Sequence, residues 1–184
     1  VCRRSGMTNR QNREFVMTQL PLECTAYVPV EYWKSDIPEG RSGDWAVERF
    51  RLEPLKREWL RPNAPPLPDW ARHRPGEYTR LRVGGTIDMM TDLHEEGWSQ
   101  KGQSREGLRR GGRAWISGLG LGLIIESMLR PENSPVDHIT VLEASQDVIR
   151  LVAGHMKQRY GTRLDVVHAD AFHWEPPSGA FYSV

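Results

Sequence analysis

Three glycines at alternate positions, Gly118, Gly120 and Gly122, constrain the fold of this chain more than any other feature. They follow the short apolar run of residues 114–117 and precede residues 123–129, whose composition favours a helix. A strand, a glycine turn and a helix in this order form the first unit of a parallel α/β sheet. Glycine lets the backbone turn sharply and approach a ligand closely, because no Cβ intervenes. The segment therefore predicts a parallel sheet with a ligand site at the turn.

Two further strand-like runs follow at the spacing of alternating strands and helices. Residues 138–142 form the second apolar run, and Glu143 follows it directly, about 20 residues beyond the last glycine. A carboxylate at this strand end can accept hydrogen bonds from both hydroxyls of a ribose. Residues 145–160 favour the connecting helix, with Ser145 placed to cap its start. A third apolar run covers residues 164–168. Together these segments predict a βαβαβ unit.

The third run is followed by Asp170, Ala171 and Phe172, which brings a second acid and an aromatic ring to the same sheet edge as Glu143. Each feature alone has an ordinary explanation as a turn, a solvated strand end or a cap. Their joint order predicts a ligand site, because the carboxyl ends of parallel strands meet at one edge. A dinucleotide fingerprint needs a small residue where Leu123 stands, so the ligand is expected to be S-adenosylmethionine (SAM).

This G-x-G-x-G spacing, with Glu143 and the acid after the third strand, resembles the class I SAM-dependent methyltransferases over residues 113–184. From Gly76 onward the chain is similar to the spermidine-synthase-like branch of that superfamily, which includes methyltransferase-like proteins of phages and bacteria. In that branch a β-hairpin precedes the fold. The resemblance implies a Rossmann-like α/β fold, SAM as the cofactor and no metal.

The resemblance also implies roles for individual residues of the site. Gly118, Gly120 and Gly122 would face the methionine part of SAM, Glu143 the ribose hydroxyls, and Asp170 with Ala171 the adenine. Phe172 or Trp174 would either flank the adenine ring or cover the sheet edge.

The chain before the glycine turn divides into two parts. Residues 78–83 and 86–90 alternate like strands around Gly84 and Gly85, which predicts a β-hairpin. Residues 92–112 are expected to form a helix that leads into the parallel sheet. We therefore divide the chain into an N-terminal arm (1–75), a hairpin with its connecting helix (76–112) and the SAM-binding α/β domain (113–184).

Residues 1–75 are rich in Arg, Trp and Pro and predict an irregular arm. Asp44 is placed to cap an amphipathic helix over residues 45–55, and the prolines of residues 62–68 exclude helix there. The tryptophans are expected to be packing anchors rather than a ligand cage, with an interface to a partner, a second copy or nucleic acid, as the alternative; they are Trp33, Trp45, Trp59 and Trp70.

Composition restricts the partners and the compartment. The formal net charge of +1 recruits neither nucleic acid nor an acidic membrane surface. No apolar run reaches the roughly 18 to 20 residues that cross a bilayer, and the N-terminus lacks the apolar core of a signal peptide. Cys2 and Cys24 have neither metal-ligand nor redox spacing. We expect a cytoplasmic protein that does not enter membranes.

The sequence reaches Val184 where a fourth parallel strand would begin. We expect the chain to be part of a longer protein, or else a partner chain or a second copy to cover the open sheet edge. The family carries its catalytic groups on that fourth strand, so catalytic residues are not assigned. Among the histidines, His168 is the nearest candidate for proton transfer.

Three functions remain open. The leading expectation is methyl transfer from SAM to an unidentified small molecule, nucleic acid or protein. Aminopropyl transfer to a polyamine is the second, because nearby acids could bind an amine; the acids are Asp88, Asp92, Glu95 and Glu96. It ranks lower, because arginines lie close to these acids in the sequence. The third is a SAM-fold module that binds or assembles without catalysis.

Overall fold

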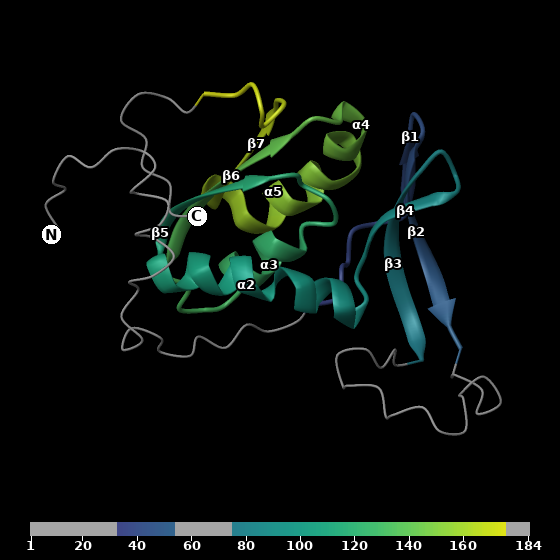
Figure 1. The fold of residues 1–184 in the computed structure, drawn as a ribbon, viewed down its shortest axis with the longest axis horizontal. Coiled ribbons are helices and arrows are strands. Elements are labelled where there is room, and N and C mark those ends of the chain that lie inside the picture. Colours follow the sequence, from purple (N-terminus) through teal and green to yellow (C-terminus); the bar gives the residue numbers. More distant parts are fainter. Residues whose placement is uncertain (1–32, 54–74, 176–184) are drawn as a thin grey trace, which may run out of the picture.

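The computed structural model describes residues 33–53 and 75–175. These residues form a four-stranded antiparallel sheet and an α/β unit built on a three-stranded parallel sheet (Figure 1). The chain is thus an α/β protein, as the sequence predicts. Cys2, Cys24, Trp59, Trp70 and the prolines of residues 62–68 lie outside the described residues.

The antiparallel sheet contains the predicted hairpin. Its strands, in chain order and in sheet order, are β1 (Gly40–Ser42), β2 (Trp45–Leu52), β3 (Gly76–Val83) and β4 (Ile87–Thr91). Gly84 and Gly85 connect β3 to β4 with φ of 60° and 71°, a left-handed conformation that side chains with a Cβ rarely adopt. The hairpin prediction is confirmed.

Strand β2 corrects the prediction for the N-terminal arm, since the helix expected over residues 45–55 is wrong. Strand β2 pairs with β3 along its whole length, and Glu48 forms ion pairs with Arg80 at 3.1 Å and Arg82 at 3.2 Å. The rings of Phe50 and Tyr78, which are direct partners, lie 5.9 Å apart. These cross-strand contacts outweigh a weak local preference for helix. Residues 40–52 are therefore part of the sheet.

The α/β unit follows the predicted order. Its main elements are α2 (His94–Arg110), β5 (Gly112–Ser117), α3 (Leu123–Leu129), β6 (Val136–Glu143), a helix in three segments, α4 (Gln146–Val148), η4 (Ile149–Ala153) and α5 (Gly154–Tyr160), then η5 (Gly161–Arg163) and β7 (Leu164–His168). The strands are parallel in the order β5-β6-β7. The hydroxyl of Ser145 accepts a hydrogen bond from the amide of Val148 at 3.3 Å, which confirms the predicted cap.

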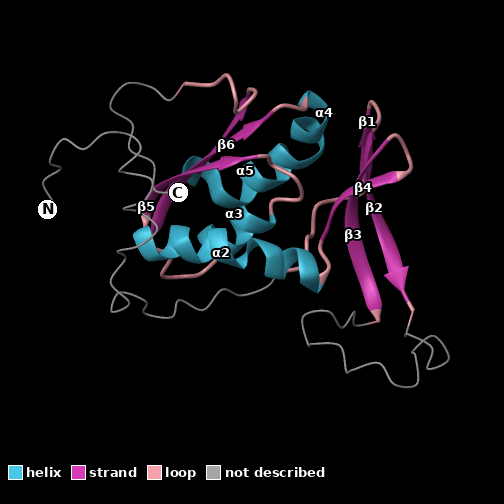
Figure 2. Ribbon diagram, viewed as in Figure 1, coloured by secondary structure: helices cyan, strands magenta, loops and turns pink. Residues whose placement is uncertain are grey.

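The helices α2, α3 and α5 pack on one side of the parallel sheet (Figure 2). Every second strand residue points to this side and joins the buried core, as Ile116 and Val141 do. On the other side, the ring of Trp115 lies 5.3 Å from that of Trp174. No helix in the described part of the chain is long and apolar enough to cross a membrane.

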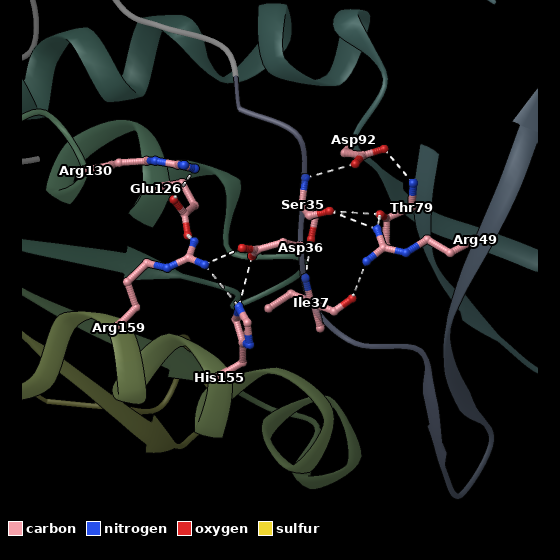
Figure 3. Close-up of polar contacts among 10 residues, drawn as sticks. All are labelled: Ser35, Asp36, Ile37, Arg49, Thr79, Asp92, Glu126, Arg130, His155 and Arg159. Atoms are coloured by element: carbon pink, nitrogen blue, oxygen red, sulfur yellow. Dashed lines mark hydrogen bonds and ion pairs between the residues drawn. The ribbon is translucent and has the colours of Figure 1, made fainter. Parts of the chain in front are cut away.

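Residues 33–37 link the two sheets, beginning with contacts to the antiparallel one (Figure 3). The buried carboxylate of Asp92 accepts hydrogen bonds from the amide of Ser35 at 2.9 Å and that of Thr79 at 2.6 Å. Arg49 of β2 donates to the carbonyl of Ser35 at 2.9 Å. Burial raises the pKa of Asp92 despite these donors.

The next residue of this linking segment, Asp36, contacts the α/β unit (Figure 3). Its carboxylate pairs with His155 of α5 at 2.9 Å and with Arg159. Arg159 also pairs with the buried Glu126 of α3, which pairs in turn with Arg130 at 3.3 Å. The linking segment therefore holds the antiparallel sheet in place beside the carboxyl ends of the parallel strands.

Candidate functional site

The glycine turn joins β5 to α3 at the carboxyl end of the parallel sheet. Gly118, Gly120 and Gly122 have φ of 88°, 50° and 74°, so each adopts a conformation that favours glycine. The amide of Gly118 donates to the carbonyl of Leu142 at 2.7 Å, which ties the turn to strand β6. The structure thus places the three predicted glycines in one loop beside the end of β6.

A cavity of 280 Å³ lies between this loop and the antiparallel sheet. Its loop side includes the three glycines, Glu143 and Val148. Its opposite side comes from β2, β3, β4 and α2, and the residues are Trp45, Leu81, Met89, Met90 and Gln100. The cavity is thus a partly open space between the glycine loop and the antiparallel sheet, mostly apolar on the side of that sheet.

Glu143 lines the cavity and also holds the glycine loop. Its Oε2 accepts a hydrogen bond from the amide of Leu119 at 2.8 Å, and its Oε1 accepts one from the amide of Ser145 at 2.8 Å. A carboxylate oxygen has two lone pairs, so each oxygen can accept one further bond. Glu143 can therefore bind ligand hydroxyls without releasing the loop.

Met90 of β4 packs directly against the glycine loop. A Cβ on Gly120 would lie 2.6 Å from the Met90 sulfur and 2.6 Å from its Cε, so the Met90 thioether would have to move to admit any larger residue here. The Met90 sulfur accepts a hydrogen bond from the amide of Leu121 at 3.1 Å. Sulfur is a weak acceptor, and a ligand oxygen would bind this amide more strongly.

The residues after β7 lie beside Glu143 but outside the cavity lining. The amide of Ala169 donates to the carbonyl of Glu143 at 3.0 Å, which places the following Asp170 at the same sheet edge. Asp170 accepts hydrogen bonds from the amide of Phe172 at 2.9 Å and pairs with His173 at 2.8 Å, and both contacts lower its pKa. Ala171 is half-buried, and Phe172 is 95% exposed. Contact of these residues with adenine stays a prediction.

The histidine considered for proton transfer does not reach the cavity. His168 Nε2 contacts the carbonyl of Ala144 at 3.0 Å, and the side chain is exposed. Among the described residues, Glu143 is the only ionisable side chain that lines the cavity. No group of three or more His, Cys, Asp or Glu in the described ranges could hold a metal ion.

The side of the cavity that the antiparallel sheet and α2 provide has no signature in the sequence. Trp45 was expected in a helix, and Met89, Met90 and Gln100 carried no motif. Trp45 packs on the core, as expected of a packing anchor, and also lines the cavity. The ring of Trp33 lies 4.0 Å from the Arg130 guanidinium.

The acids considered for amine binding do not line the cavity. Asp88 pairs with Arg82 at 2.9 Å and Arg80 at 3.7 Å, and the buried Asp92 accepts the backbone amides of Ser35 and Thr79. Glu95 and Glu96 of α2 are also absent from the lining. The described cavity therefore offers no acidic cluster to a polyamine.

Comparison of the chain with models of protein families, with curated proteins and with solved structures gives no match.

Proposed function

We propose that the chain binds SAM in the cavity at the glycine loop and transfers its methyl group to an acceptor. One observation carries the proposal: Glu143 and the three glycines line a single cavity at the carboxyl edge of a parallel sheet. Ligands of open α/β sheets bind at this edge. The β5-β6-β7 order, with helices α3 and α5 on one side, is what a Rossmann-like SAM-binding unit needs.

The spacing of the loop supports SAM over a dinucleotide. Leu123 stands where the third residue of a dinucleotide fingerprint is small, and its side chain is buried in the core. The amide of Leu121, now bonded to sulfur, could bind the carboxylate of the methionine part. Glu143 has lone pairs left for the two ribose hydroxyls.

The chemistry of methyl transfer suits a cavity with few polar groups. The positive sulfonium makes the methyl group electrophilic, so the protein mainly aligns a nucleophile and excludes water. Glu143 is the only proton-accepting side chain in the described lining, and it already holds two amides. The acceptor atom should therefore carry its own free lone pair at neutral pH.

The same scarcity of proton acceptors favours a second candidate, a module that binds SAM without catalysis. Aminopropyl transfer receives less support, since Asp88 and Asp92 are committed to other contacts outside the cavity. Binding and catalysis are separable, so the two remaining candidates can be distinguished once the ligand is known.

Isothermal titration of the full chain with SAM, S-adenosylhomocysteine, decarboxylated SAM and NAD tests the proposal. We expect micromolar binding of SAM and S-adenosylhomocysteine and weaker binding of the other two. Binding of NAD alone, or no binding by a folded sample, would reject it. Given SAM binding, transfer of a labelled methyl group to any acceptor in a mixed extract supports the enzyme over the module.

A further inference from the structure

The wall of the cavity opposite the glycine loop has a distinct chemistry. Its indole, aliphatic and thioether side chains are uncharged, and its one strongly polar side chain is Gln100 of α2. If SAM occupies the glycine loop, this wall is what an acceptor meets. The side chains of this wall therefore determine which class of methyl acceptor can bind in the site.

Gln100 has an unused hydrogen-bond acceptor. The side chain is buried, with 8% of the residue exposed, and its Nε2 donates to Glu96 Oε1 at 3.0 Å. Its Oε1 is buried and has no hydrogen-bond partner among the described residues. Exchanging Nε2 and Oε1 by a flip of the side-chain amide would place Oε1 against the Glu96 carboxylate, where two acceptors would repel. Oε1 is therefore the atom left without a hydrogen-bond partner.

A buried carbonyl without a partner destabilises the folded chain, and such atoms in native proteins need an explanation. Here the residue lines a cavity, so the missing partner can be a ligand donor. A ligand N–H or O–H would satisfy Oε1, whereas a ligand that has only acceptors would not.

Charge restricts the ligand further. The described wall offers neither a carboxylate to a cation nor a basic group to an anion, because Arg80 and Arg82 pair with Asp88 and Glu48 outside the cavity lining. A charged group would lose its hydration in this wall without gaining a partner, which is costly. An uncharged methyl acceptor loses little hydration free energy when it enters the cavity.

We infer that the acceptor, or the part of it that enters, is an uncharged and largely apolar group that donates a hydrogen bond to Gln100 Oε1. The inference rests on the proposed function, because it assigns SAM to the loop side of the same cavity. Gln100 is then a specificity-determining residue that selects a donor-bearing acceptor.

The cavity is too small for SAM and a methyl acceptor together, so some of its lining side chains must move. Its 280 Å³ lies just below the roughly 300 to 1,000 Å³ of small-molecule sites, so SAM and an acceptor need more room. Met89 lines the cavity and is 54% exposed, and Met90 packs on the loop. Methionine changes its torsions at low cost, so these two side chains can move to widen the cavity that Gln100 lines.

The test uses four probes of similar shape: phenol, toluene, benzylammonium and benzoate. Binding to the full chain is followed by NMR shifts of the Trp45 indole N–H and by titration, with and without S-adenosylhomocysteine. We expect phenol to bind about tenfold more tightly than toluene, and both ions to bind at least tenfold more weakly than phenol. In Gln100→Leu and Gln100→Met the preference for phenol over toluene should disappear, while toluene binding stays within about twofold.

Equal binding of phenol and toluene to the unmodified chain would overturn the inference, and so would binding of benzylammonium as tight as that of phenol when S-adenosylhomocysteine is present and occupies Glu143. Both outcomes are independent of whether either variant folds. Because the probes are also tested without S-adenosylhomocysteine, their preference is separate from cofactor binding. Loss of S-adenosylhomocysteine binding with an intact phenol preference would reject the proposed function and leave Gln100 as a ligand-selecting residue.

Discussion

The sulfur of Met90 accepts a hydrogen bond from the backbone amide of Leu121 at 3.1 Å. The two residues come from different units, Met90 from β4 of the antiparallel sheet and Leu121 from the glycine loop. The contact occupies a loop amide that a ligand would otherwise bind. Ligand binding at the loop and the position of β4 should therefore be coupled.

Met90→Ala should tighten SAM binding by about tenfold, because it enlarges the cavity and frees the Leu121 amide from a weak acceptor. Titration calorimetry measures the change. Met89→Ala is the matched control, since Met89 lines the same cavity but is 54% exposed, whereas the hydrogen bond from the loop goes to Met90. Weaker SAM binding in a folded Met90→Ala variant would instead show that the thioether contributes to the site.

Glu143→Ala should weaken SAM binding by roughly 1 to 3 kcal/mol and also lower the free energy of unfolding, because the amides of Leu119 and Ser145 lose their acceptor. Glu143→Gln retains one acceptor oxygen and should recover part of the stability. Calorimetry and chemical denaturation separate the two effects. If SAM affinity in the folded Ala variant equals that of the unmodified chain, Glu143 holds the loop but does not bind the ribose.

Gly120→Val should abolish SAM binding, because φ at this position is 50°, a conformation that a β-branched residue rarely adopts, and because its side chain would displace the Met90 thioether that packs on the loop. Gly118→Ala is a milder comparison: φ is 88°, but no atom lies within 4 Å of the added Cβ. We expect Gly118→Ala to retain measurable binding. Normal binding by Gly120→Val would mean that the loop is only a turn.

Arg159→Met should lower the free energy of unfolding by about 3 kcal/mol, because the buried Glu126 loses one of its two arginine partners. Chemical denaturation measures this change. Arg150→Met is a control, since Arg150 is 64% exposed and pairs only at the surface with Asp147; its effect should stay below about 1 kcal/mol. Equal effects of the two substitutions would argue against a special role for the Glu126 pair.

Asp36→Asn should destabilise the fold at neutral pH by no more than about 1 kcal/mol, because the Asp36 side chain is 51% exposed. Desolvation raises the pKa of Asp36, but hydrogen bonds from Arg159 and His155 outweigh it and the net pKa is lowered from 3.8. A carboxylate whose pKa is lower in the folded chain than in the unfolded chain stabilises the fold at a pH above its unfolded-state pKa. This stabilisation is lost as the pH falls through the folded-state pKa. Unfolding curves of the variant and the unmodified chain should therefore converge in acid; a constant difference would exclude the ionic contribution.

The local sequence determined the turns, caps and strands that depend only on interactions between residues close together in the chain. The glycines between β5 and α3, Ser145 at the start of α4, and the Gly84-Gly85 turn are predicted correctly, since each meets a backbone requirement within a few residues. The three parallel strands follow from apolar runs separated by helix-forming segments. Glu143 and the glycines fall on one sheet edge because parallel strands align their carboxyl ends.

Tertiary structure decided what depends on contacts between distant residues. Trp45–Leu52 carries a pattern compatible with helix, and it is a strand because Glu48 and Phe50 find partners on β3. Met90 reaches the cavity because residues 33–37 hold the antiparallel sheet against the α/β unit, and Gln100 reaches it because α2 packs on α3 and β6 of that unit. The glycine loop could thus be predicted from sequence, but the wall that faces it could not, because long-range pairing leaves no local periodic signal.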